Sequence, residues 1–324
     1  MQIPEGLGLY WRDSSSVQIG LHPGRQAIFP GLYPREVPML NLLRNPCTKE
    51  DVELWARSNQ VDLGRAAKIW ADVEATGLAL DRSMPGTMAR TEYAAAARAG
   101  TLEPDRAGTV AIEIHGGGLI GAVLALSLGL YGFGSISISD SSPITESVAR
   151  WLGTAAFGKP FESAIRPRLQ SSAQEPEEKI VISISSRVYP LHIARACLAD
   201  DIPYLPVVIA EADIQIGPFV TGTPCIECVE SARAEKDRAW PLLSAQAGRL
   251  PMLEAETASA FQSCAIVIGE LLQYVGRPDL EPRLSSSILH VPPPPLWPTV
   301  ETVPRFQGCG CASGPVGVHD VEDR

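Results

Sequence analysis

A glycine-rich loop constrains the fold of this 324-residue chain more than any other feature. The loop reads Gly116-Gly-Gly-Leu-Ile-Gly121 and follows an apolar strand pattern at Val110–Ile114. An apolar helix pattern continues from the loop to about Leu130, and a second strand pattern covers Ser135–Asp140. A strand, a GxGxxG turn, a helix and a further strand make a βαβ unit with a right-handed crossover. The sequence therefore predicts a Rossmann-like α/β domain with a mostly parallel sheet.

The same loop is a candidate nucleotide site. Gly116, Gly118 and Gly121 occupy the glycine positions of the pattern, where glycine permits a tight turn and lets the helix N-terminus approach a phosphate. Asp140 ends the next strand about twenty positions later, where an acidic side chain can hold a ribose hydroxyl. Close packing of a strand on a helix demands glycine as well. The loop therefore predicts the fold and leaves nucleotide binding open.

Four of the seven cysteines form two closely spaced pairs, Cys225-Ile-Glu-Cys228 and Cys309-Gly-Cys311. Four thiolates complete a tetrahedral structural zinc site, which here would attach the C-terminal tail to the body of the domain. The alternative is four reduced cysteines or a redox pair. Cys197 and Cys264 fall within apolar helix patterns, and Cys47 lies in a loop, so these three are interpreted as packing residues.

The N-terminal region predicts a separate small module over residues 1–81. Three short strand patterns come first, at Leu7–Arg12, Val17–Leu21 and Gln26–Pro30. Three helix patterns and a returning strand follow, at Val37–Leu43, Lys49–Ser58, Leu63–Thr76 and Leu78–Asp81. This order is that of a winged-helix-like module. Residues 82–108 have the composition of a linker, and residues 109–324 form the α/β domain.

Charge and hydropathy argue against two classes of partner. The formal net charge is −10, and no cluster of Lys and Arg offers the phosphate contacts on which nucleic-acid binding depends. The apolar stretches, such as that around Leu119–Leu130, are shorter than the ~20 residues of a membrane span. The first residues show no basic region and no apolar signal core, so we expect the chain in the cytoplasm.

Three features together resemble the ThiF/MoeB-like branch of the ubiquitin-activating-enzyme superfamily. They are the βαβ glycine loop, the sequence Gly222-Thr-Pro-Cys225-Ile-Glu-Cys228 and the terminal cysteine pair, and the resemblance covers roughly Thr109–Ala312. It implies binding of ATP with Mg²⁺ and adenylation of the C-terminus of a peptide or ubiquitin-like protein. It also implies that the Zn²⁺ site is structural and that the chain forms a homodimer.

The chain departs from the adenylating members at several positions. Their Asp-x-Asp reads Asp140-Ser-Ser142 here, and the segment ending in Arg150 lacks their Asn. Phe161 stands where a catalytic Lys is expected, with Lys159 one step out of register. The strand that should precede a magnesium-binding Asp runs into Ser185-Ser186-Arg187. Phosphoryl chemistry depends on such charges. We therefore expect a slow or inactive site, with Asp140, Lys159 and Arg150 as the catalytic candidates if it is active.

The N-terminal module resembles the peptide-recognition modules of ribosomally made, modified peptide (RiPP) pathways. In that family a precursor's leader peptide adds as a strand beside the third strand and rests on the third helix. The resemblance places the leader along Gln26, Ile28 and Phe29, facing Arg65 and Lys68. A DNA-binding winged helix is the competing reading. It is disfavoured because the third helix region carries acidic residues beside its two cations.

Three functions remain open. The first is a leader-peptide-binding adaptor of azole or thiopeptide biosynthesis that presents its substrate to a YcaO-like cyclodehydratase and has lost adenylation. The second is an active ATP-dependent adenylyltransferase acting on a peptide or carrier-protein C-terminus. The third, an NAD-dependent oxidoreductase, rests on the glycine loop alone, since no residue in the second half is an obvious hydride-transfer acid or base. Glu211-Ala-Asp213 adds acids near the carboxyl end of the sheet.

Overall fold

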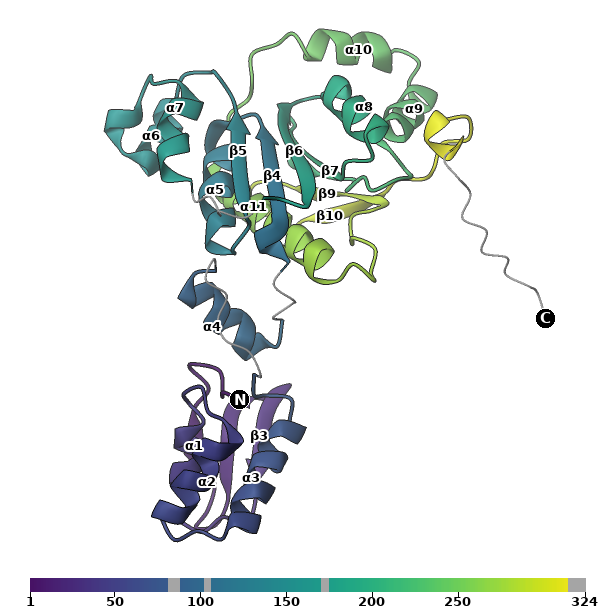
Figure 1. Cartoon of the computed structure of the whole chain (residues 1–324). Helices are drawn as coiled ribbons and strands as arrows, with labels where there is room; N and C mark the ends of the chain where they lie inside the picture. The colour runs from purple at the N-terminus through teal and green to yellow at the C-terminus, as the bar shows by residue number, and fades with distance from the viewer. Residues whose placement is uncertain (81–87, 102–105, 170–174, 314–324) are drawn as a thin grey trace, which may run out of the picture. The chain divides into compact units, whose positions relative to one another are not determined.

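The chain divides into two compact units, Met1–Pro104 and Asp105–Arg324. A computed structural model describes residues 1–80, 88–101, 106–169 and 175–313, and Figure 1 shows their helices and strands. Each unit has its own hydrophobic core and is described by itself.

The first unit is a three-stranded antiparallel sheet in the order β1-β2-β3, with three helices packed on one face. The strands are β1 (Leu9–Trp11), β2 (Val17–His22) and β3 (Arg25–Phe29), and the helices are α1 (Val37–Leu42), α2 (Lys49–Ser58) and α3 (Leu63–Ala75). Helix α2 begins at a capping box in which the Thr48 and Asp51 side chains each bond the other's backbone N–H. Strand β3 is an edge strand of this sheet.

Two details differ from the sequence-based expectation. The returning strand expected at Leu78–Asp81 is reduced to one antiparallel bridge between Leu80 and Gln2, and Asp81 lies outside the described residues. The expected linker contains helix α4 (Arg90–Ala99). Arg25 donates hydrogen bonds to the carbonyls of Ala97 and Arg98, so the end of α4 is held against the β2–β3 hairpin of the first unit.

The second unit is built on a seven-stranded sheet in the order β10-β9-β8-β7-β6-β4-β5. The strands are β4 (Val110–His115), β5 (Ser135–Ser139), β6 (Glu178–Ser186), β7 (Tyr204–Ile209), β8 (Ile214–Ile216), β9 (Ser287–Val291) and β10 (Thr299–Thr302). Strands β5, β4, β6 and β7 are parallel neighbours, while β8, β9 and β10 extend the sheet with antiparallel pairs. The predicted Rossmann-like α/β class is confirmed, and the antiparallel extension is an addition to it.

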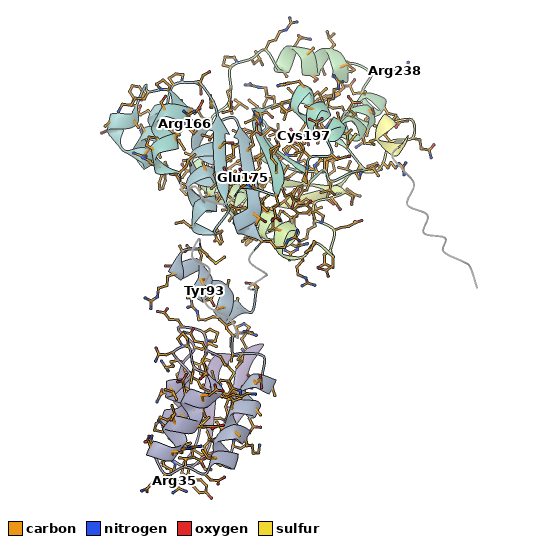
Figure 2. The ribbon with its side chains drawn as sticks, in the orientation of Figure 1. Arg35, Tyr93, Arg166, Glu175, Cys197 and Arg238 are labelled. Atoms are coloured by element: carbon orange, nitrogen blue, oxygen red, sulfur yellow. The ribbon has the colours of Figure 1, made fainter. Side chains whose placement is uncertain are left out.

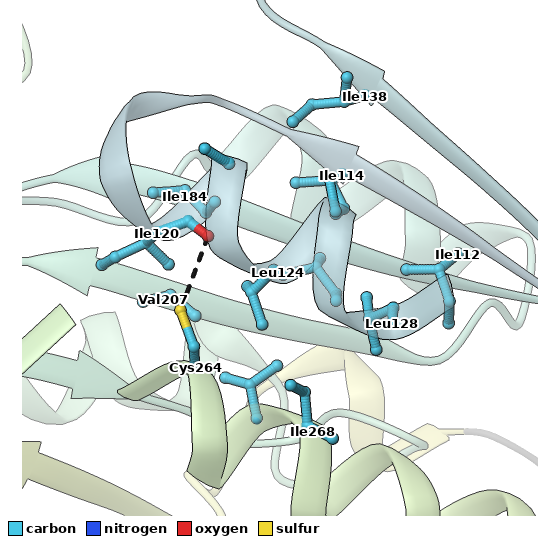
Figure 3. Close-up of a cluster of buried hydrophobic side chains, with 14 of the residues drawn as sticks. Ile112, Ile114, Ile120, Leu124, Leu128, Ile138, Ile184, Val207, Cys264 and Ile268 are labelled. Atoms are coloured by element: carbon cyan, nitrogen blue, oxygen red, sulfur yellow. Dashed lines mark hydrogen bonds between the residues drawn. The ribbon is translucent and has the colours of Figure 1, made fainter. Parts of the chain in front are cut away.

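Helices cover both faces of this sheet (Figure 1). Helices α5 (Gly118–Leu130) and α11 (Thr257–Gly276) pack on one face, and α8 (Leu191–Ala199) and α9 (Ile226–Lys236) on the other. Helices α6 (Glu146–Leu152) and α7 (Phe161–Ile165) lie beside α5, and α10 (Trp240–Ala247) follows α9. Figure 3 shows the contact of α5 with α11, where the Cys264 thiol approaches the Ile120 carbonyl at 3.6 Å.

Helix α11 corrects one expectation about membranes. Its 20 residues are long and apolar enough to cross a bilayer, whereas no stretch of that length was expected. Half of its apolar window is buried inside the protein, and residues such as Val267 and Leu271 are inaccessible to solvent. Its apolar character is therefore explained by packing against α5 and the sheet.

Candidate functional site

The glycine loop lies between the end of β4 and the start of α5, and two of its glycines are required by the backbone alone. Gly116 has φ +106°, and a Cβ there would lie 2.2 Å from the Ile184 carbonyl oxygen of the neighbouring strand. A Cβ on Gly121 would lie 2.9 Å from the Gly116 carbonyl oxygen. Both glycines are explained by close packing of helix on strand, with no ligand needed.

Gly117, at the start of α5, is closed off by side chains of this chain. A Cβ there would lie 2.1 Å from Asp140 Oδ2 and 3.1 Å from Phe161 Cδ1. The Asp140 carboxylate also accepts a hydrogen bond from the Ser142 N–H at 2.7 Å. The Asp140 side chain therefore lies close to the start of α5. Phe161, which replaces the expected Lys, is 1% exposed beside it.

A cavity of about 240 Å³ opens beside the loop, at the carboxyl ends of the parallel strands. Gly118 at the start of α5, Asp140 directly after β5 and Ile209 at the end of β7 line its wall. Most of the wall is apolar, and its charged residues are Asp140 and Glu254. No Lys or Arg is among the described residues that line it.

The structure brings together only part of the predicted nucleotide site. Asp140 and Gly118 line the cavity, whereas Lys159 and Arg150 do not. Arg150 pairs with Glu146 on the same helix at 2.8 Å, with 73% of its side chain exposed. Lys159 is exposed in the loop before α7. The catalytic candidates therefore do not converge on this cavity, and both cations are exposed to solvent.

Sequence reasoning missed the segment that forms another wall of the cavity. Met252, Leu253 and Glu254 come from the coil between α10 and α11. Arg187, at the end of β6, donates to the Pro251 carbonyl at 2.8 Å and pairs with Glu211 at 3.3 Å. The coil has no periodic pattern, so only the tertiary structure identifies it.

The four paired cysteines meet on the opposite face of the sheet. Their Sγ atoms all lie within 4.8 Å of one another, with Cys225 to Cys309 at 3.6 Å and Cys228 to Cys311 at 3.5 Å. A tetrahedral zinc with Zn–S bonds of about 2.3 Å separates its sulfurs by about 3.8 Å, so these side chains fit that ion. Burial raises the pKa of the Cys225 and Cys309 thiols, and a bound cation would offset that cost by favouring the thiolates.

The zinc that these cysteines could hold would have a structural task. Cys225 and Cys228 lie at the start of α9, while Cys309 and Cys311 come from the C-terminal segment drawn in yellow beside α9 in Figure 1. Four thiolates leave no coordination position open for a substrate. The ion would therefore fasten the tail to the second unit.

The three remaining cysteines are packing residues. Cys47, Cys197 and Cys264 are buried, and burial raises the pKa of each thiol, to about 12 for Cys264. Figure 2 shows Cys197 on α8 inside the second unit. Reactive cysteines are exposed and have lowered pKa values, so none of the three resembles a nucleophile.

Edge strand β3 places the predicted peptide-binding residues on different sides. Gln26 and Ile28 are exposed, and Ile28 shares the outer face of the sheet with Tyr10. Gln26 accepts a hydrogen bond from the Gln18 amide at 2.8 Å. Phe29 is 6% exposed and belongs to the core beneath the helices. Alternation along a strand therefore leaves Gln26 and Ile28, but not Phe29, open to a partner.

The two predicted cations of α3 already have partners. Arg65 pairs with the buried Glu36 at 3.1 Å and donates to the Gly31 carbonyl, just beyond β3, at 2.6 Å. Glu36 is 2% exposed. Burial opposes its charge, but hydrogen bonds from Arg65 and the Tyr33 N–H prevail and lower its pKa. Lys68 pairs with Asp72 at 2.7 Å. Arg65 therefore fixes the chain after β3, and Lys68 is the more accessible of the two.

Comparisons with known proteins find similar folds and no similar sequence. No family model and no curated protein matches this chain. E. coli MccB with succinimide has a TM-score of 0.60 at 14% identity, over 97% of this chain and 99% of that one. The microcin C7 biosynthetic enzyme MccB with N-formylated MccA gives 0.60 at 14%, over 96% and 98%. PaaA gives 0.61 at 15%, over 92% and 99%. Identities this low show the fold alone, and at that level the predicted Rossmann-like α/β architecture is confirmed.

Proposed function

We propose that this chain is a leader-peptide-binding adaptor of a RiPP pathway that has lost adenylation. The observation that carries the proposal is the cavity at the glycine loop, whose charged lining residues are two carboxylates. Adenylation stabilises developing negative charge with metal ions and fixed cations. A site lined by two carboxylates, with no Lys or Arg among its described lining residues, is unsuited to a triphosphate.

The first unit supplies the peptide-binding surface in this proposal. A leader peptide would add as a strand along β3, where main-chain hydrogen bonds provide affinity and side chains provide selectivity. Gln26 and Ile28 would contact it directly, and Lys68 could exchange Asp72 for an acidic leader residue. Arg65 would act through Gly31 and Glu36, by holding the end of β3 in place. MccB has been solved with the peptide MccA, which is a precedent in a protein of the same fold.

The second unit would then be a scaffold for assembly. In the proposal it presents the core of the bound precursor to a separate YcaO-like cyclodehydratase, in the cytoplasm. A structural Zn²⁺ on Cys225, Cys228, Cys309 and Cys311 stabilises its tail, and a homodimer is the assembly expected by analogy. These assignments follow from the resemblance, and the fit of the four thiolates supports the zinc.

The test is titration of the full chain with candidate leader peptides by calorimetry. We expect micromolar binding and at least about tenfold weaker binding for Ile28→Glu, because the edge of β3 would carry an unpaired charge. Leu21→Glu is the matched control, since Leu21 is also an exposed aliphatic residue of this sheet, on β2. Equal affinity of the two variants would remove β3 as the binding edge, and no binding of any leader would overturn the adaptor.

An active adenylyltransferase is the second candidate. The intact glycine loop and the position of Asp140 in the cavity favour it, and MccB has also been solved with ATP. ATP–pyrophosphate exchange separates the two functions. Robust exchange that disappears in Gly118→Ala and Asp140→Asn would replace the adaptor with an enzyme. Exchange at background level in the wild-type chain, with leader binding intact, supports the adaptor.

A further inference from the structure

The cavity beside the glycine loop is smaller than typical pockets for drug-sized ligands and large enough for one ring. Its volume is about 240 Å³. Pockets for drug-sized ligands are roughly 300–1,000 Å³, and a dry apolar cavity of roughly 150 Å³ already accepts benzene. The space therefore suits a single aromatic group the size of one large side chain.

The charges at the cavity exclude an anion. Asp140 and Glu254 both line it, and no cation is among its described lining residues. Arg187, which anchors the coil above, is occupied by Glu211 and by the Pro251 carbonyl. Asp140 is half-buried and Glu254 is exposed. Both carboxylates repel negative charge and accept hydrogen bonds from N–H or O–H groups. Charge complementarity thus favours a ligand that donates hydrogen bonds.

The wall chemistry favours a planar ring over an aliphatic chain. Phe161 and Met252 both line the cavity. Aromatic rings pair edge to face with one another, and the polarisable thioether of methionine makes favourable contacts with ring edges. Neither interaction is gained by a branched aliphatic group of the same volume.

The coil that covers the cavity is fixed at both ends. The Arg187 guanidinium bonds the Pro251 carbonyl at 2.8 Å, and the Leu253 N–H donates to Ser186 Oγ at 3.1 Å. Glu256 caps α11 by accepting from the Ala258 and Ser259 N–H groups, each at 2.9 Å. The cavity is therefore already formed, and a ligand entering it has little ordering cost to meet.

We propose that this cavity binds one aromatic ring that carries a hydrogen-bond donor and no negative charge, in place of a nucleotide. The inference rests on the proposed loss of adenylation and deepens it, because it names the group that the altered site now holds. In an adaptor, an aromatic side chain of the precursor's core would supply that ring, and a free aromatic molecule has the same chemistry.

A matched pair of indole compounds tests the proposal. Indole-3-acetamide and indole-3-acetate share ring and size and differ in charge. Calorimetry with the full chain should give saturable binding of the amide, at least about tenfold tighter than binding of the acetate. Equal affinity for the two, or no saturable binding of the amide in the millimolar range, overturns the proposal.

Two sets of variants locate the binding. Ala255→Trp fills the cavity and should abolish binding of the amide, while Ala258→Trp, on the exposed first turn of α11, should leave it unchanged. The double variant Asp140→Asn with Glu254→Gln keeps the side-chain shapes and should bring the amide-to-acetate ratio close to one. If both Trp variants bind the amide equally well, the ring binds elsewhere and the assignment is wrong. The assignment is also wrong if the double variant leaves the amide-to-acetate affinity ratio unchanged.

A competition experiment identifies the molecule that supplies the ring. It also shows which of the two proposals a negative result rejects. A full-length precursor that displaces indole-3-acetamide, when its leader alone does not, assigns the ring to the peptide core. Displacement by neither assigns it to a free aromatic molecule. Ala255→Trp should still bind the leader, since β3 lies in the other unit. If the chain binds the leader but not the amide, the cavity assignment is rejected and the adaptor function stands. If it binds the amide but no leader, the adaptor function is rejected and the cavity assignment stands.

Discussion

The cysteine cluster and the glycine-loop cavity belong to the same α/β unit and differ in how many of their predicted residues come together. All four thiols converge within 4.8 Å, the full ligand set for a structural zinc. The cavity keeps its glycines and Asp140 but has Phe161 in place of a lysine and no lining cation among its described residues. The predicted zinc ligands therefore come together, whereas the predicted nucleotide-site cations Lys159 and Arg150 do not line the cavity.

Loss of a cysteine ligand should have the largest effect on this comparison. Cys228→Ser should lower the unfolding free energy of the second unit by about 3 kcal/mol or more, because the metal-dependent tie to the tail is lost. Metal analysis and thermal unfolding measure it, with Cys197→Ala as a buried control outside the cluster. A wild-type chain without zinc, and a Cys228→Ser variant of unchanged stability, would show that the cluster holds no structural metal.

The loss of stability on substitution of each loop glycine should follow its backbone conformation and packing, and not its distance from a nucleotide. Gly116→Ala should cost about 2 kcal/mol of stability, since φ is +106° and the new Cβ would meet the Ile184 carbonyl. Gly118→Ala should cost about 1 kcal/mol, because its φ is +66° but no atom lies within 4 Å of the new Cβ. Chemical denaturation measures both. The opposite ranking would mean that the loop is not kept for packing.

ATP should hardly stabilise the chain. A ligand that binds the native state raises the melting temperature through its binding free energy, so excess ATP with Mg²⁺ should shift it by less than about 1 °C. Differential scanning fluorimetry with and without ATP checks this. A shift of several degrees that is absent in Asp140→Asn would show that the cavity binds ATP. The cavity and the cysteine cluster would then both be functional sites.

Removal of the Arg150 and Lys159 side chains should have the smallest effect on stability. Arg150→Ala and Lys159→Ala should change stability by no more than about 0.5 kcal/mol, because both side chains are exposed and Arg150 forms only a surface pair with Glu146. Both variants should also bind the leader normally in calorimetry. A marked loss of ATP–pyrophosphate exchange in either one would restore it to the catalytic site.

Local patterns predicted much of the fold. The capping pair Thr48 and Asp51 set the start of α2, and α2 has the bounds that the sequence indicates. The short strands β8 and β10 were missed because three or four residues are too few to display a period, and all four residues of β10 are exposed. Of the sites, the cysteine set followed from spacing, whereas the partners of Arg65 and Lys68 did not, because those contacts depend on where α3 lies.

The sequence by itself determined the βαβ order around Gly116–Gly121 and the four thiolates, because periodicity and spacing are local properties of the chain. Only the tertiary structure decided which charges meet at the cavity. Lys159 stands next to Pro160 and Phe161 yet is turned out to solvent, while Glu254 arrives from a distant coil. Packing of helices and loops on the sheet fixes such long-range contacts, and it has left the cavity apolar and acidic.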